Sequence, residues 1–460
     1  MEAKEVEHIE AALPYIPPLS APQPTPAAGT ALWRERIHNF SWQWHVVVMA
    51  TGVCSSLLHN FPYQDGTGAF KVAALSLFLF DLVLFVMLCV WAVARCTMFP
   101  KDRVLMLTDP ATSLFIGFFT NGAASLINAA LSVNRDWGTG DKVLLYTLWG
   151  LWWLDSVLAC MVAFGLIYLM LGEQSNDLSK LRPSWMVPVI TLITMSASGG
   201  LFARSLQAHS HVLALLSVSV SAAMLAIGLS FTMMLTTAFL LRLYLHGPLD
   251  ATVVLSTFTT LTPLGQGGFA LLTAGADLAA LLPAAPGPAP AAALPGAVAY
   301  GACICGAYAL WSMGVAWVAV ACFSIARRAH DLPRFTISHW CVVVPNGVFA
   351  ALSIQLGTAL DSPFFRAFGA GWAGLVFLLW IVTFLRSLVA IWDGSIFDKP
   401  GAVPAEAKAA EVVEVVKDKF DEEGPAQIEI LPSLRPSDVE SVAETLWGSD
   451  RATLRNDSMV

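Results

Sequence analysis

Ten long apolar stretches are the feature of this 460-residue sequence that most limits what the chain can fold into. Each is long enough for the roughly 20 residues that an α-helix needs to cross the hydrocarbon core of a bilayer. They lie near residues 42–62, 69–95, 109–133, 143–172, 185–204, 211–241, 251–282, 297–326, 335–359 and 367–392. Only 13% of the residues are charged, which is about half the fraction usual in soluble proteins. The sequence therefore predicts an all-α integral membrane protein with ten transmembrane helices.

Clusters of small residues interrupt five of these stretches, and the five are the odd members of the series. The clusters are residues 50–52, 120–123, 196–200, 263–268 and 345–347. Measured between the glycines at positions 52, 122, 199, 267 and 347, the steps are 70, 77, 68 and 80 residues. A near-constant interval indicates an internal repeat.

The interruptions predict broken helices, because proline removes a backbone donor and clashes with the preceding turn. Lipid tolerates such a defect only where protein or a water-filled cavity satisfies the freed groups. Short links join each odd stretch to the next even one, which predicts five helical hairpins. We expect the interrupted member of each hairpin to face a central pore, although close helix packing through small residues is the alternative.

The side chains beside the interruptions suggest that the pore carries anions. Exposed N–H groups and neutral hydroxyls or amides can replace the hydration of an anion without holding it too tightly for release. The candidate pore and anion-binding residues are Thr51, Gly52, Asn121, Gly122, Ser196, Ser198, Gly199, Thr262, Gln266, Gly267, Asn346 and Gly347. Ser55, Thr120, Asn128, Thr260 and Gln355 lie near them and have the same chemistry.

Ionisable side chains within the apolar stretches are few, and such groups are functional candidates by default. Asp81 and Asp155 lie on even stretches, where a structural ion pair or hydrogen bond is the favoured interpretation and proton coupling the alternative. His45 is a third candidate, in the first stretch. Arg204 follows the fifth stretch, as either a cation at the outer mouth of the pore or an ordinary interfacial arginine.

The loops predict the orientation. Those after the second, fourth, sixth and eighth stretches carry nine lysines and arginines, against five in the other set. The positive-inside rule puts the first set and both termini in the cytosol. Residues 1–40 are rich in proline and residues 394–460 hold 14 acidic and 7 basic residues, so we expect a disordered leader and an acidic, largely disordered tail around a transmembrane domain at 41–393.

Motifs for enzyme chemistry are missing from the sequence. The eight cysteines fall in or at the ends of apolar stretches, with no CxxC or other metal-ligand spacing, and no HExxH, phosphate-binding glycine loop or nucleophile elbow occurs. We expect no enzyme activity, no cofactor, no metal and no nucleic-acid partner. A membrane receptor is the alternative from another class, but ten helices do not fit a heptahelical receptor.

Four strings of residues resemble the fungal sulfite efflux pumps of the tellurite-resistance/dicarboxylate transporter family, which includes malate permeases and the plant slow anion channels. They are residues 41–63, 148–155, 263–269 and 345–347, in the same order across about 350 residues. The resemblance implies ten helices in five hairpins around a central pore. It also implies a homo-oligomer in the membrane lipid, a trimer as in the channel members, with a dimer as the alternative.

One position departs from the family pattern. In the channel relatives a phenylalanine one position before the ninth-helix proline plugs the pore, and Val344 stands there in this sequence. Either the plug is absent, or Phe349 or Phe269 takes its place.

The sequence and the resemblance together predict export of sulfite or bisulfite across the plasma membrane, driven by the membrane potential. A C4-dicarboxylate permease for malate and a broad anion channel of the same fold are the alternatives.

Overall fold

The structure is a computed structural model, and every regular element in the part it describes is helical. It describes residues 28–64, 68–101, 109, 112–138, 140–172, 178–282, 294–331 and 335–397. The acidic tail beyond residue 397 and the loop residues Arg103 and Arg334 lie outside the described residues.

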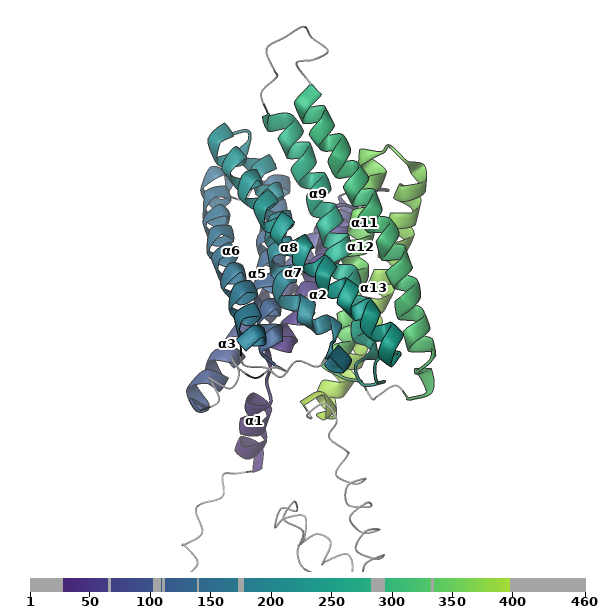
Figure 1. Ribbon diagram of the computed structural model, residues 1–460. Helices are drawn as coiled ribbons and strands as arrows, with labels where there is room; N and C mark the ends of the chain where they lie inside the picture. The colour runs from purple at the N-terminus through teal and green to yellow at the C-terminus, as the bar shows by residue number, and fades with distance from the viewer. Residues whose placement is uncertain are drawn as a thin grey trace, which may run out of the picture. The chain divides into compact units, whose positions relative to one another are not determined.

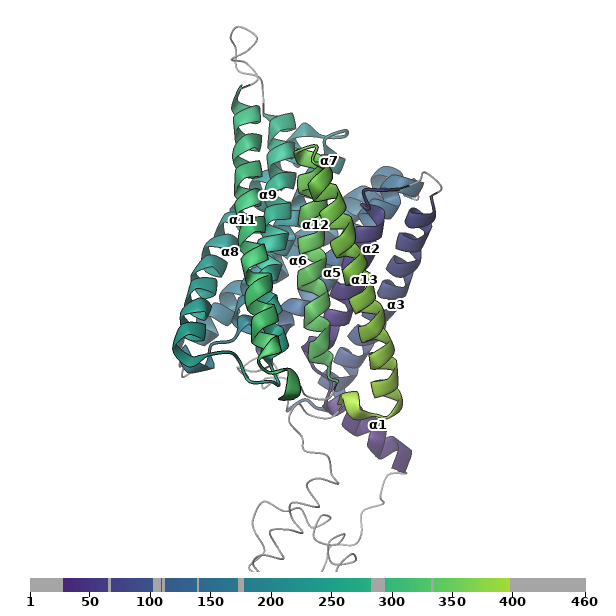
Figure 2. The same ribbon diagram turned by 90° about the vertical axis from the view of Figure 1, so that its right-hand side faces the viewer.

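The described residues form ten long helices. These run side by side in one bundle, as Figures 1 and 2 show from two directions. The odd members, here called the inner helices, are α2 (Val46–His59), α5 (Ile116–Trp137), α7 (Val187–Leu206), α9 (Leu261–Leu281) and α12 (Val343–Ala359). The even members, the peripheral helices, are α3 (Ala69–Met98), α6 (Asp141–Gly172), α8 (His211–His246), α11 (Leu294–Ala326) and α13 (Pro363–Trp392). Each inner helix packs against the peripheral helix that follows it.

Burial separates the two sets of helices. In the most apolar segments of the spans built on α7, α12 and α5, 89%, 78% and 56% of the residues are buried. In those of α3, α11 and α13, 17%, 22% and 22% are buried. In the part of the chain that the structure describes, eight helices are long and apolar enough to cross a membrane. Neither α2, with 14 residues, nor the glycine-rich α9 is among these eight, and both belong to the inner set. The chain is thus an all-helical, multi-pass membrane protein whose inner helices are the more buried ones.

The five predicted breaks are wrong in position. Each inner helix is continuous through its cluster of small residues, including Pro345 in α12 and Pro263 in α9. The irregular turn comes earlier, as a 3₁₀ segment directly before each inner helix: η2 (Trp42–His45), η3 (Ser113–Phe115), η5 (Pro183–Met186), η6 (Val254–Thr260) and η8 (Ile337–Val342). None of the peripheral helices begins this way in the described residues.

Local chemistry explains why the α-helices do not break. Pro263 and Pro345 lie in the first turn of α9 and α12, where a backbone N–H has no partner within the helix and its loss is tolerated. The glycines instead allow close helix contact. A Cβ on Gly265 would lie 2.8 Å from the backbone nitrogen of Phe349, and one on Gly268 would lie 2.7 Å from Leu352. The packing interpretation is therefore correct for these glycines.

Tryptophans of the peripheral helices bind polar groups on the inner helices. The indole Nε1 of Trp380 donates to Thr51 Oγ1 over 3.2 Å, and that of Trp372 donates to Asn346 Oδ1 over 3.2 Å. These bonds satisfy polar groups on the outer faces of α2 and α12, where unpaired groups would be costly. Thr51 and Asn346 therefore face α13.

Part of the leader has structure as well. Residues Ala28–His38, within the segment predicted to be disordered, form the 11-residue helix α1 near the end of the bundle where α13 finishes (Figure 2). Arg36 lies 5.0 Å from the ring of Phe397, and the His38 ring lies 4.8 Å from that of Phe99. These cation–π and ring contacts explain why this segment is held.

Candidate functional site

A central cavity of about 110 Å³ lies between the inner helices. That volume is several times what one water molecule requires. All five inner helices contribute to its wall, and none of the peripheral helices does among the described residues. Its polar lining residues are Ser56, Asn60, Asn121, Ser125, Asn128, Thr194, Thr262, Gln266 and Gln355.

Helical phase decides which residues reach this cavity. On α5 the lining residues are Asn121, Ser125 and Asn128, and on α9 they are Thr262, Gln266 and Phe269. Steps of three and four residues place side chains on one face of an α-helix. Each inner helix therefore presents a single stripe to the cavity and turns its other faces to neighbouring helices.

The cavity wall has no ionisable side chain among its described lining residues. Asn121 is 2% exposed, and neither its amide nitrogen nor its amide oxygen has a hydrogen-bond partner among the described residues. Asn128 donates from Nδ2 to Ser198 Oγ over 2.8 Å, while its Oδ1 has no partner among them. Buried amides are usually paired, so these unpaired groups stand out in the cavity wall.

The predicted pore residues divide into two groups. Gly52, Asn121, Thr262 and Gln266 lie in the cavity wall, as do the gate candidates Val344 and Phe269. The others lie outside it: Thr51, Gly122, Ser196, Ser198, Gly199, Gly267, Asn346, Gly347 and the gate candidate Phe349.

The excluded residues have other neighbours. Phe349 is fully buried and stacks on Trp311 of α11, with the ring centres 6.0 Å apart. A Cβ on Gly267 would meet Leu229 of α8 at 2.7 Å. Gly122 packs against Val48 of α2, and Gly347 against Val53 of α2. These positions pack inner helices against each other or against the peripheral layer.

A second space, here called the vestibule, opens at the C-terminal ends of α2, α5 and α7 and has a volume of about 90 Å³. It shares six lining residues with the central cavity: Ser56, Asn60, Asn128, Leu201, Phe269 and Gln355. The two spaces therefore adjoin, and these six residues, here called the neck, surround their junction.

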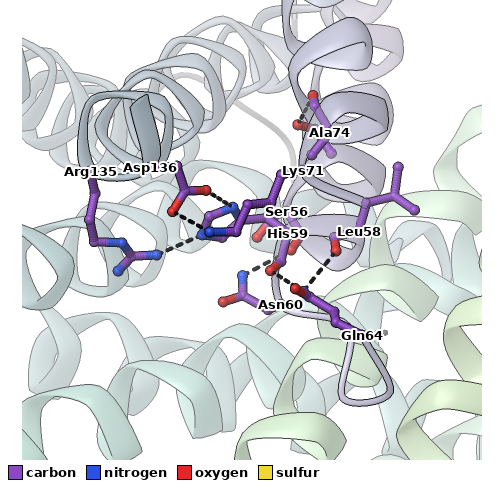
Figure 3. Close-up of polar contacts among 10 residues, drawn as sticks. Ser56, Leu58, His59, Asn60, Gln64, Lys71, Ala74, Arg135 and Asp136 are labelled. Atoms are coloured by element: carbon purple, nitrogen blue, oxygen red, sulfur yellow. Dashed lines mark hydrogen bonds and ion pairs between the residues drawn. The ribbon is translucent and has the colours of Figure 1, made fainter. Parts of the chain in front are cut away.

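Charged side chains line the vestibule. His59, Lys71, Arg135 and Asp136 form a bonded cluster at the ends of α2, α3 and α5 (Figure 3). Arg204, predicted at the mouth of the pore, also lines the vestibule and lies 3.4 Å from Asp277 of α9.

The ionisable groups within the helices lie behind the cavity wall. Asp81 is fully buried, and its Oδ2 lies 3.1 Å from where a Cβ on Gly52 would be. The carboxyl oxygens of Asp81 and Asp155 have no hydrogen-bond partner in the described residues. His45 is fully buried, with Nδ1 3.2 Å from the Trp42 carbonyl oxygen. None of these three residues lines either space.

Four polar lining residues are not among the sequence candidates: Ser56, Asn60, Ser125 and Thr194. The signal that could have found the first three is spacing. Gly52, Ser56 and Asn60 follow one another at four-residue steps, and Ser125 lies between Asn121 and Asn128 on the same helical face.

Comparison with known families and proteins agrees with this architecture. The family model described as voltage-dependent anion channel matches residues 39–388, which include all ten long helices except the last turn of α13. The chain belongs to this family. It is therefore an anion transport protein and not an enzyme, and the receptor alternative is set aside.

Similar proteins include pumps and transporters. The chain is 29% identical to the sulfite efflux pump SSU1 of Trichophyton rubrum over 351 residues, which cover 76% of this chain and 90% of that protein. It is 25% identical to the sulfite efflux pump SSU1 of Candida albicans over 250 residues, or 54% of this chain and 50% of that one. An uncharacterized transporter of Methanocaldococcus jannaschii is 23% identical over 365 residues, or 78% of this chain and 97% of that one.

Proposed function

We propose that this protein exports sulfite or bisulfite across the plasma membrane through the central cavity, driven by the membrane potential. The observation that carries the proposal is the wall of that cavity, in which five helices present amides and hydroxyls and no described ionisable side chain. The 29% identity with a protein named a sulfite efflux pump supports the choice of anion.

Neutral donors suit an anion that must enter and leave. The amide N–H groups of Asn121 and Gln266 and the hydroxyl of Thr262 can replace water around an oxyanion. A fixed cation in the cavity would bind the anion more tightly and slow its release, whereas conduction needs easy exit. The unpaired amide of Asn121 is the group best placed to bind it.

The membrane potential supplies the driving force in this proposal. One charge that crosses a potential of 100 mV changes free energy by about 2.3 kcal/mol. A cytosol-negative potential therefore drives anion export without a coupled ion. The positions of Asp81 and Asp155, outside the cavity wall, favour uncoupled export over proton coupling.

The proposal includes an orientation and an assembly. The 3₁₀ ends of the inner helices face the cytosol and the vestibule faces outward, as the distribution of loop lysines and arginines supports. The acidic tail then lies in the cytosol. The protein assembles as a homo-oligomer, with three copies by family resemblance, each holding its own pathway.

A broad anion channel is the second candidate function. The family description favours it, since it names anions without a substrate, and the neutral cavity wall has no group that selects sulfur chemistry. A malate permease remains the third possibility, because a C4-dicarboxylate would also bind amides and hydroxyls.

A flux assay on the full chain in proteoliposomes tests these candidates. Release of sulfite, nitrate, chloride and malate is measured at equal pH on both sides, with and without an imposed potential. The proposal predicts sulfite release that increases with the potential and exceeds malate release. Similar rates for all small anions would establish the broad channel, and malate flux alone, dependent on a proton gradient, would overturn the sulfite proposal.

A further inference from the structure

The charged cluster in the vestibule has a bonding pattern that transport through the central cavity does not require. His59 is the last residue of α2, Lys71 lies in the first turn of α3, and Arg135 and Asp136 lie in the last turn of α5. Figure 3 shows the His59 ring between Arg135 on one side and Asp136 on the other. The side chains of His59 and Asp136 are about nine-tenths buried.

The partners of His59 define its protonation state in this arrangement. Arg135 Nη2 lies 2.6 Å from His59 Nε2, and a guanidinium group can only donate. Nε2 must therefore accept, which leaves the ring neutral with its proton on Nδ1. That proton is donated to Asp136 Oδ2, 2.9 Å away.

As a result, within the part of the chain that the structure describes, some charged side chains of the vestibule have a partner of opposite charge and Arg135 does not. Asp136 uses Oδ2 for His59 and Oδ1 for Lys71 at 3.4 Å, and Arg204 pairs with Asp277. Arg135 has no carboxylate partner in any ion pair of the described residues, and its one hydrogen bond among them goes to the neutral ring of His59. The positive charge of Arg135 in the wall of the vestibule is therefore not compensated by an ion pair in the described residues.

We propose that the vestibule contains a second anion-binding site, in which Arg135 binds a small oxyanion and neutral His59 holds Arg135 away from it. This deepens the proposed function, since the site lies next to the neck through which the exported anion would leave. A guanidinium group matches the geometry of an oxyanion because its parallel N–H donors reach two oxygens together.

Protonation of His59 switches the site on. A proton on Nε2 would put an N–H donor against the N–H donors of Arg135, so the contact becomes repulsive and the guanidinium turns into the vestibule. The new charge would rest at the C-terminal end of α2, where the helix dipole favours a cation. Acid outside the cell therefore increases the affinity of the vestibule for anions.

The charged groups that face His59 come from two further helices, α3 with Lys71 and α5 with Arg135 and Asp136. Arg204 of α7 also lines the vestibule and pairs with Asp277 of α9. Among these residue types, histidine has the ordinary pKa closest to neutrality. Replacement of His59 is therefore the variant that isolates the switch.

Nitrate is the probe for the test, because it is a trigonal oxyanion whose charge stays constant over this pH range, whereas sulfite and bisulfite interconvert. Its binding is measured through the thermal stabilisation of the purified full chain, which rises with ligand concentration relative to the dissociation constant. We expect the dissociation constant for nitrate to be about five- to tenfold lower at pH 5.5 than at pH 7.5, which is the pH-dependent component of binding. A change of this size is typical of the coupling between linked sites.

Two variants and a control separate the outcomes. His59→Gln should bind nitrate equally at both pH values, and Arg135→Gln should lose the pH-dependent component. Arg366→Gln, which removes an arginine paired with Asp361 between α12 and α13, should behave as the wild type. The unliganded melting temperature reports whether each variant is folded.

Unchanged pH dependence in folded His59→Gln, or pH-independent binding by the wild type, would overturn the second site. Sulfite flux is measured on the same preparations. Flux without pH-dependent nitrate binding would contradict this inference alone, and pH-dependent binding without sulfite flux would contradict the proposed function while the vestibule site stands.

Discussion

The central cavity and the vestibule are neighbouring spaces of similar size, about 110 and 90 Å³, with different chemistry. The cavity is lined by amides, hydroxyls and apolar side chains, whereas the vestibule is lined by charged residues that are largely paired with each other. An anion in the cavity would exchange water for neutral donors, and one in the vestibule would meet full charges still partly in water. The two spaces therefore differ in what they can do. The neutral donors of the cavity allow an anion to pass, whereas the charges of the vestibule set the local anion concentration near the mouth.

Loss of the Asn121 amide should have the largest effect. Asn121→Leu removes amide donors that have no partner among the described residues, and a hydrogen bond to a charged group contributes about 1.5–3 kcal/mol. We expect sulfite flux to fall roughly 10- to 100-fold in proteoliposomes while the melting temperature stays the same or rises, because a buried unpaired amide is lost.

Asn346→Leu is the matched control for that prediction. Its amide is bound by the Val342 carbonyl and Trp372 rather than free in the cavity. Its loss should lower the free energy of unfolding by about 1–3 kcal/mol with little change in flux per folded protein. If both asparagines affected flux equally, the cavity wall would not be the pathway.

Narrowing the cavity should have the next largest effect. Val344 lies in its wall, and a phenyl ring there would occupy much of 110 Å³. We expect Val344→Phe to reduce sulfite flux severalfold at unchanged expression. Phe349→Leu removes a buried ring that stacks on Trp311. It should instead lower the free energy of unfolding by roughly 1–2 kcal/mol and leave the flux per folded protein unchanged.

Widening the neck should change the sulfite flux in the opposite direction, by raising it. Phe269 and Leu201 are the two apolar members of the neck between the cavity and the vestibule. Removal of the ring in Phe269→Ala should raise sulfite flux a few-fold, since a bulky apolar side chain would no longer narrow the junction. Reduced flux in a folded variant would show that the ring positions the anion rather than obstructs it.

Removal of a charged side chain from the vestibule should have the smallest effect on sulfite flux. Lys71 is nearly half exposed, and exposed ion pairs contribute about 0.2–1 kcal/mol. Lys71→Met should lower sulfite flux roughly twofold at low ionic strength and not measurably at about 1 M salt, where the screening length is about 3 Å. The Asn121→Leu deficit should persist at high salt, and equal salt sensitivity of the two variants would remove the distinction between the two spaces.

The number of helices and their alternation could be predicted from the sequence, because length, apolar composition and a repeat at 70 to 80 residues constrain both. The location of the irregular turns could not. Proline at 345 predicts a break only if it falls beyond the first turn of a helix, and the helix begins just two residues earlier, at Val343. The start of an α-helix depends on tertiary contacts with the neighbouring 3₁₀ segment, which no local pattern contains.

Of the twelve predicted pore residues, four lie in the cavity wall and eight do not. A position beside a glycine does not give the helical phase of a side chain. It favours Thr51, which bonds Trp380, and not Ser125, which lies in the cavity wall. Steps of three and four residues lead from Asn121 to Ser125 and Asn128, and from Gln266 to Thr262 and Phe269, all of which lie in the cavity wall. The vestibule pairings could not be predicted, because they join the ends of three helices that only the fold brings together.

The most direct test of the account is chemical blockage of the cavity. Ser125 lies in its wall and Ser196, on α7, does not, and none of the eight native cysteines lines it. Full-length Ser125→Cys and Ser196→Cys in proteoliposomes are treated with N-ethylmaleimide, the reagent is washed out, labelling is measured by mass spectrometry, and sulfite flux is then compared with treated wild type. The account predicts loss of flux in proportion to labelling at position 125 and wild-type flux at position 196. Full flux through protein labelled at position 125 would contradict it.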